Sequence, residues 1–221
     1  GANAFCITNG FDVDASTTLS MTEENSKTLP LSNSTTKFTL SYIGVLEQLR
    51  NPDILWETLN DLVEENADFK NDFELKFVGR LDDKILQKIE SSALKNNLTN
   101  LGYQTHDVAL KHMQDSTVLL MTNFPQESSK GIIPGKIFEY LATGKTILSF
   151  GPKDADVEKI LNETKAGKHF GYDEKENLKK FILESYENWK LGTLNQNAEN
   201  IEQFSRKNLT QKLVDLMNKW F

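Results

Sequence analysis

The chain is poor in the residues on which disulfide-bonded, metal-binding and nucleic-acid-binding proteins depend. Its single cysteine, Cys6, excludes an internal disulfide and favours a reducing, cytoplasmic location. Among its three histidines, His106 and His112 are six positions apart, not the four that place two metal ligands on one helical face, so we expect no metal site. Acidic residues outnumber basic ones, 32 to 25, which argues against a general nucleic-acid binder. No apolar run is long enough to cross a bilayer.

What is present is a regular alternation of short apolar runs and amphipathic segments. Residues 15–37 are rich in Ser, Thr and Asn and predict a long connecting loop, whereas the chain after residue 174 is mostly helical in pattern. The predicted strands are 38–43, 75–78, 98–101, 118–121, 147–150 and 169–172. The predicted helices are 52–66, 83–96, 107–114, a short one around Lys136, and 155–161. This alternation predicts an α/β fold, a doubly wound, mostly parallel, Rossmann-like sheet with helices on both faces.

Glycines follow several of the predicted strands. Gly44, Gly79 and Gly102 each lie at or beyond a strand end, and Gly131 opens the loop that leads to the helix around Lys136. In a parallel sheet these positions fall on one rim, and ligands of doubly wound sheets bind outside that rim, near the point where the strand order reverses. We therefore expect a ligand site there.

The segment 131–150 is the most informative part of the chain. Pro134 suits the first turn of a helix, and Gly144 suits its end. Lys136 and Glu139 lie close together on that helix, where a cation and a carboxylate suit a nucleotide diphosphate and its ribose. A plain surface ion pair explains the same spacing, and spacing alone favours that interpretation.

Four segments together resemble the retaining GT-B glycosyltransferases, of the large bacterial group 1 (family 4-like). They are I-T-N-G-F-D at 7–12, Y-I-G with R-N-P at 42–52, F-V-G at 77–79 and P-G-K-I-F-E-Y-L-A-T-G-K-T-I-L at 134–148. The segments occur in the family's order and extend over about residues 5–190. The resemblance implies the C-terminal, nucleotide-sugar-binding half of a GT-B fold.

The resemblance also implies a division of the chain. Residues 1–14, with a cloning remnant at the start, would be the interdomain crossing segment, and 15–37 the loop. Residues 38–190 would be the donor-binding domain, and 191–221 a C-terminal helical extension. The partner would be a missing N-terminal acceptor domain, through which the protein could associate peripherally with a membrane.

Several donor-binding residues are implied by the matched motifs. Glu139 would bind the ribose hydroxyls, and Lys136 and Arg50 the diphosphate, with Gly44 in the loop that follows the first strand. The family usually carries a second basic residue near Gly44, which helps to bind the diphosphate. It is absent here, so this diphosphate clamp has one arginine instead of two basic residues and is called the thin clamp below. Arg80 would help from the next strand end, or else pair with a neighbouring aspartate.

One departure from the family pattern concerns the sugar. Many members carry two glutamates eight positions apart, but eight positions before Glu139 stands Gly131. This implies either an altered donor or a sugar held by the backbone N–H groups of Gly131, Ile132 and Ile133. Gly102 and Tyr103, after the third strand, complete the donor-binding set that we predict.

The resemblance implies a glycosyltransferase that moves a sugar from a nucleotide-diphosphate sugar to a glycan, lipid or small-molecule acceptor, without a bound metal or other cofactor. No catalytic residue is assigned, and the isolated half is expected to be nearly inactive. Two alternatives remain at this point. One is a nucleotide-sugar epimerase of related fold, although the visible motifs supply no acid–base groups for it. The other is an inactive nucleotide-sugar-binding module, which Gly131 and the thin clamp make credible.

Overall fold

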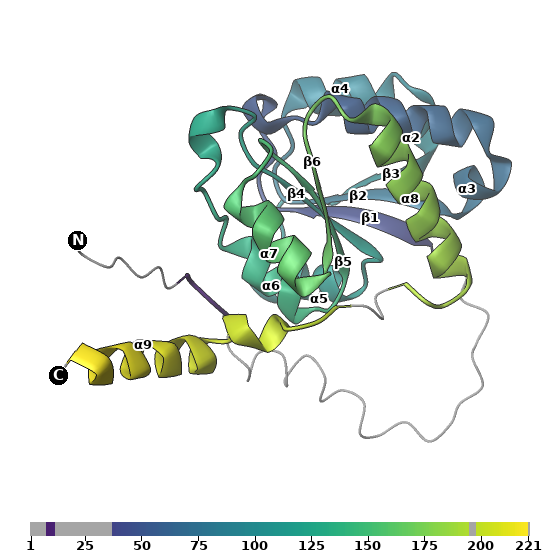
Figure 1. The fold of residues 1–221 in the computed structure, drawn as a ribbon. Coiled ribbons are helices and arrows are strands. Elements are labelled where there is room, and N and C mark those ends of the chain that lie inside the picture. The colour runs from purple at the N-terminus through teal and green to yellow at the C-terminus, as the bar shows by residue number, and fades with distance from the viewer. Residues whose placement is uncertain (1–7, 12–36, 195–197, 221) are drawn as a thin grey trace.

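A single parallel sheet forms the centre of the protein (Figure 1). The computed structural model describes residues 8–11, 37–194 and 198–220. Within them the strands are β1 (Phe38–Ile43), β2 (Phe73–Val78), β3 (Leu98–Asn100), β4 (Val118–Thr122), β5 (Thr146–Phe150) and β6 (Gly167–Phe170). Their order is β3-β2-β1-β4-β5-β6, and every neighbouring pair is parallel. The predicted doubly wound parallel sheet is confirmed.

Helices cover both faces of the sheet (Figure 1). One face packs against α2 (Asp53–Glu65), α3 (Ala67–Asp72), α4 (Asp83–Glu90) and α8 (Lys175–Lys190). The other face packs against α5 (His106–Gln114), α6 (Lys136–Ala142) and α7 (Asp156–Thr164). The helices change face where the chain passes from β3, at one edge, to β4 beside β1. The strand order therefore reverses between β1 and β4, which is where doubly wound sheets bind their ligands.

Aromatic side chains fill the core under α3 and α8. Phe69 stacks on Phe73 with ring centroids 4.9 Å apart, and the ring of Tyr186 meets Phe69 edge-on at 5.1 Å. The Tyr186 hydroxyl donates a hydrogen bond to Asp72 Oδ2 at 2.6 Å, so its polar end is satisfied at the surface. This cluster fixes α8 across the start of β1 and β2, away from the rim where ligands are expected.

The predicted helix 83–96 is wrong in its second half. Helix α4 ends at Glu90, and a separate 3₁₀ turn occupies Ala93–Asn97. Two serines cause the break, because the hydroxyls of Ser91 and Ser92 bond to the backbone carbonyls of the last turn and so compete with the helix. The Ser92 hydroxyl also accepts a bond from the next segment, at Leu94 N, and starts the 3₁₀ turn.

Helix α3 was not predicted. Only Asn66 separates it from α2, and the signal for it was local: the Asn66 side chain accepts a hydrogen bond from Phe69 N at 3.0 Å, which is a helix N-cap. The apolar pattern alone does not separate α2 from α3, because Phe69 faces the same core as the apolar side of α2.

The two ends of the described chain meet beside α6. Phe11 forms a parallel bridge with Ser205; Phe11 N donates to Phe204 O at 3.1 Å, and Arg206 N donates to Phe11 O at 2.8 Å. From this bridge α9 (Arg206–Trp220) extends away from the sheet (Figure 1). Apart from 8–11 and Lys37, the predicted crossing segment and the loop 15–37 lie outside the described residues. Across the described residues, no helix has both the length and the apolar character that crossing a membrane requires.

Candidate functional site

The carboxyl ends of β1, β2 and β3 lie close together and carry three of the glycines that were predicted to share one rim. Gly44 N donates to Val78 O at 2.7 Å, and Gly79 N donates to Gly102 O at 2.7 Å. Gly79 adopts φ +128°, and a Cβ on it would lie 2.1 Å from Gly44 O. Only glycine permits this approach of two backbones. The prediction that these glycines share one rim is confirmed.

Lys136 reaches from α6 to the end of β1. Its Nζ donates a hydrogen bond to Ile43 O at 2.9 Å and lies 4.5 Å from the centre of the Tyr42 ring. Burial, reinforced by the nearby positive charge of Arg50 and opposed by Glu139, lowers the pKa of Lys136 to about 8. The ammonium therefore lies at the point where the strand order reverses, and it is poorly hydrated there.

Arg50 supplies a second cation from the loop between β1 and α2. Its Nη2 donates to Val45 O at 3.1 Å and lies 3.4 Å from Glu47 Oε2. The guanidinium carbon is 5.5 Å from the centre of the Phe124 ring, which follows β4. Its Nε is buried and has no hydrogen-bond partner among the described residues. The side chain is 23% exposed, so the guanidinium can still present N–H groups to an anion.

Glu139 points to solvent from the first turn of α6. It makes no ion pair with Lys136 within the part of the chain that the structure describes, because the lysine turns inward to Ile43 O. The surface ion pair that spacing alone favoured is therefore absent there. The carboxylate remains within electrostatic range, since it raises the pKa of Lys136 against the effect of burial.

The start of α6 differs from the prediction. The helix begins at Lys136 with Gly135 as its N-cap, so Pro134 precedes the helix. Ile137 N donates to Pro134 O at 3.0 Å, and Phe138 N donates to Gly135 O at 3.2 Å. These bonds use two of the amides that a helix start would otherwise offer to a phosphate. The cationic side chains therefore carry more of any phosphate binding than the sequence suggested.

The Gly131 loop is fixed by a buried asparagine at the end of β4. Asn123 Nδ2 donates to Ile132 O at 3.0 Å. The amide of Ile132 donates to Ser129 O at 2.9 Å, so this N–H already has an acceptor within the loop. The amides of Gly131 and Ile133 have no acceptor among the described residues, and they remain candidates.

Arg80, Gly102 and Tyr103 lie further along the rim, at the ends of β2 and β3. Arg80 is exposed and forms no ion pair with either neighbouring aspartate in the described part of the chain. Asp82 instead caps α4 by accepting a bond from Lys84 N at 2.9 Å. Tyr103 is 88% exposed. The structure thus gathers Gly44, Arg50, Lys136 and the Gly131 loop around β1 and β4, whereas the side chains of Arg80 and Tyr103 are exposed.

Four residues that organise this site were missed by the sequence reasoning. Tyr42 supports Lys136 and donates its hydroxyl to Val45 O at 2.9 Å, and Phe124 lies beneath Arg50. Tyr172 donates its hydroxyl to Asn123 O at 2.5 Å, which ties the end of β6 to the end of β4. Asn123 could have been predicted as a site residue from its place directly after the buried apolar run of β4. No local feature of the sequence indicates such a role for Tyr172.

Among the residues that the structure describes, no three His, Cys, Asp or Glu side chains gather in a way that could hold a metal ion. The chemistry visible at the rim is thus that of two cations, one exposed carboxylate and two free backbone amides. Such a set can neutralise phosphate and accept hydrogen bonds from hydroxyl groups.

No protein-family model matches the chain, and neither does any curated protein. Solved structures do. TarM of S. aureus, crystallised in complex with UDP, has a TM-score of 0.63 at 19% identity, over 99% of this chain and 40% of that one. HepE of Anabaena, in complex with UDP-glucose, has a TM-score of 0.64 at 17% identity, over 96% of this chain and 57% of that one. The trehalose-phosphate synthase of Burkholderia xenovorans has a TM-score of 0.66 at 10% identity, over 96% and 50%.

The chain thus covers between 40% and 57% of the length of these structures. At such low identity the likeness establishes the fold. The chain has the fold of GT-B glycosyltransferases and fits their C-terminal domain, as the sequence resemblance implied.

Proposed function

We propose that this chain is the donor-binding half of a glycosyltransferase, which moves a sugar from a nucleotide-diphosphate sugar to a glycan, lipid or small-molecule acceptor. The observation that carries the proposal is the 2.9 Å hydrogen bond between Lys136 Nζ and Ile43 O. It holds a cation at the strand-order reversal, where doubly wound sheets bind nucleotides, with Arg50 nearby. Two structures of the same fold, TarM and HepE, were crystallised with UDP and UDP-glucose. No observation favours the epimerase or the inactive module.

In this proposal each residue has a role set by its chemistry. Lys136 and Arg50 bind the diphosphate, and Glu139 accepts hydrogen bonds from the ribose. When the glycosidic C–O bond breaks, negative charge grows on the departing diphosphate, and two cations fixed in a poorly hydrated site stabilise it. We further propose that transfer retains anomeric configuration and requires no bound metal.

The acceptor would bind to a second domain. The matched structures are about twice as long as this chain, which supports a missing N-terminal half. Helix α9 supports it too, because Leu213, Val214 and Met217 are 41–52% exposed along it. Apolar side chains grouped on a projecting helix commonly mark an interface. We propose a cytoplasmic enzyme whose missing half supplies the acceptor site and any peripheral membrane contact, so that the half alone binds nucleotide but turns over poorly.

The test is calorimetric titration of UDP and GDP into the wild-type chain and the Glu139→Gln variant. Loss of a charge-assisted hydrogen bond should weaken the better-bound nucleotide by about tenfold or more. Glu163→Gln, which neutralises an exposed glutamate on α7, is the matched control and should leave affinity unchanged. Equal affinity for the wild type and Glu139→Gln would remove Glu139 from the site. A wild type that binds neither nucleotide would refute the proposed function.

A further inference from the structure

A carboxylate lies beside Gly131, at the position where the chain has no side chain of its own. Asp156 begins α7, in the loop region that follows β5. A Cβ built on Gly131 would have Asp156 Oδ2 at 4.0 Å and no closer heavy atom. The sequence gives no hint of this, because the two residues belong to different strand–helix units.

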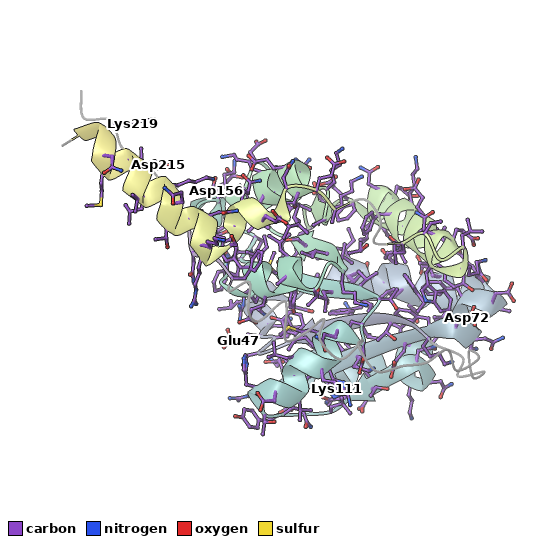
Figure 2. All side chains as sticks on the ribbon, turned by 90° about the horizontal axis from the view of Figure 1, so that it is seen from below. Glu47, Asp72, Lys111, Asp156, Asp215 and Lys219 are labelled. Carbon is purple, nitrogen blue, oxygen red and sulfur yellow. The ribbon has the colours of Figure 1, made fainter. Side chains whose placement is uncertain are left out.

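The two segments are held together by the backbone. Asp156 N donates a hydrogen bond to Lys130 O at 2.9 Å, so the start of α7 is fixed to the Gly131 loop. Both belong to the connections that leave the carboxyl ends of β4 and β5, on the same rim as the cations. Figure 2 labels Asp156 and Glu47, which follows β1, toward one end of the molecule, and Asp72, which precedes β2, at the other.

The two oxygens of this carboxylate are used differently. Oδ1 accepts a hydrogen bond from Lys159 Nζ at 2.8 Å, a pair whose side chains are 42% (Asp156) and 64% (Lys159) exposed. Oδ2, on the Gly131 side, has no donor among the described residues. The carboxylate does not cap α7 either, because Ala155 is the N-cap and no side chain makes a capping hydrogen bond there.

The loop that carries Gly131 also offers backbone donors without an acceptor. The amides of Gly131 and Ile133 have no acceptor in the described part of the chain, and Asn123 fixes the loop that carries them. A sugar hydroxyl both donates and accepts, so amides and a carboxylate oxygen together suit a pair of neighbouring hydroxyls. A phosphate has no proton to give to Asp156 and is repelled by it. The arrangement thus distinguishes a sugar from the diphosphate that the cations bind.

We propose that Asp156 Oδ2 accepts a hydrogen bond from a hydroxyl of the donor sugar, while the Gly131 and Ile133 amides donate to it or to its neighbour. Asp156 is then the sugar-recognition residue of this site, working from α7 in the space that Gly131 leaves open. The inference rests on the proposed function, since it assigns the sugar end of the same nucleotide-sugar site.

The test compares sugar nucleotides with bare nucleotides. UDP, UDP-glucose, GDP and GDP-mannose are titrated calorimetrically into the wild type, Asp156→Asn and the control Glu163→Gln. For the base that the wild type prefers, Asp156→Asn should weaken the sugar nucleotide about tenfold, the loss of one charged hydrogen bond, and leave the bare diphosphate within about twofold. The control should change neither. If Asp156→Asn weakens both ligands equally, or neither, the inference is overturned.

A second variant tests the position. Gly131→Glu added to Asp156→Asn brings a carboxylate into the same space from the other side, where the Cβ meets no backbone. Its affinity for the sugar nucleotide should recover to within about threefold of the wild type, whereas Gly131→Glu alone should weaken binding because two carboxylates repel each other. A double variant that unfolds at the wild-type midpoint yet stays as weak as Asp156→Asn overturns the assigned position.

Failure of this inference is distinguishable from failure of the proposed function. If the wild type binds nucleotide and Glu139→Gln weakens it, the donor site stands whatever Asp156→Asn does. If the wild type binds no nucleotide, both fail together. An unchanged preference for sugar nucleotide over diphosphate in Asp156→Asn would overturn only the assignment of Asp156.

Discussion

The ammonium of Lys136 should make the protein less stable at neutral pH than at alkaline pH. Its pKa is about 8 in the folded chain, against 10.5 in an unfolded one. Between these values the unfolded chain binds more protons, so the free energy of unfolding rises with pH across that window. The buried ammonium thus destabilises the folded chain fully at pH 7, and this destabilisation disappears as the pH rises above 10.5.

The magnitude follows from the shift. A difference of 2.5 pKa units (10.5 minus 8) corresponds to about 3 kcal/mol at pH 7, and it shrinks to about 1 kcal/mol at pH 10. Lys136→Met keeps the unbranched stem and removes the charge, but leaves Ile43 O without its donor, which costs about 1 kcal/mol at every pH. We expect the variant to be about 2 kcal/mol more stable than the wild type at pH 7 and roughly equal at pH 10.

The measurement is urea unfolding of both proteins at pH 7, 8, 9 and 10. The difference between them isolates Lys136, because every other titrating group is shared. Lys180→Met, at a side chain that is 75% exposed, is the matched control and should follow the wild type at each pH. If the free energy of unfolding of Lys136→Met changed with pH in parallel with that of the wild type, the ammonium would not be desolvated. The same variant should weaken diphosphate binding, so that stability and affinity change in opposite directions.

Three further predictions concern the rim. Arg50→Ala should weaken a nucleoside diphosphate by about tenfold or more and the bare nucleoside hardly at all, as measured by calorimetry; equal losses would refute its role. Gly79→Ala should lower the free energy of unfolding in urea by about 3 kcal/mol or more, because the new Cβ would lie 2.1 Å from Gly44 O at φ +128°. A loss below about 1 kcal/mol would show that the backbone at the rim can move to accommodate the methyl group. Asn123→Ala should lower the free energy of unfolding by about 1–3 kcal/mol, because Ile132 O loses its donor. The same variant should weaken the binding of a sugar nucleotide more than that of the diphosphate; equal losses for both ligands would show that the loop does not bind the sugar.

Much of the fold could be predicted because its signals are local. Buried parallel strands are continuous apolar runs, and β4 and β5 were placed to within a residue or so from their runs alone. The glycines that follow β1, β2 and β3 were sufficient to place one rim. The break after α4 was missed because Ser91 and Ser92 act through hydroxyl bonds to carbonyls, which an apolar period does not contain.

The candidate site was predicted less completely because its contacts join distant parts of the chain. Helical spacing relates Lys136 only to its neighbours, such as Glu139, and so suggested a surface ion pair. Its actual partner, Ile43 O, is 93 positions away and is a backbone atom, which leaves no mark in the residue types. The approach of Asp156 to Gly131 depends in the same way on the pairing of β4 with β5.

An acidic chain can still present a positive site if its cations are held without neutralising them. Several lysines on the surface pair with carboxylates, as Lys88 does with Asp53 at 2.6 Å and Lys179 with Glu65 at 2.6 Å. Lys136 is held instead by a carbonyl and an aromatic ring, which orient the ammonium without forming an ion pair with it. Gly44 is part of this arrangement, because a Cβ there would lie 3.2 Å from the Lys136 Nζ and require it to shift by a few tenths of an ångström. The position of the positive charge that a ligand meets therefore depends on the backbone after β1. The net charge of −7 belongs to the chain as a whole and does not prevent a locally positive site there.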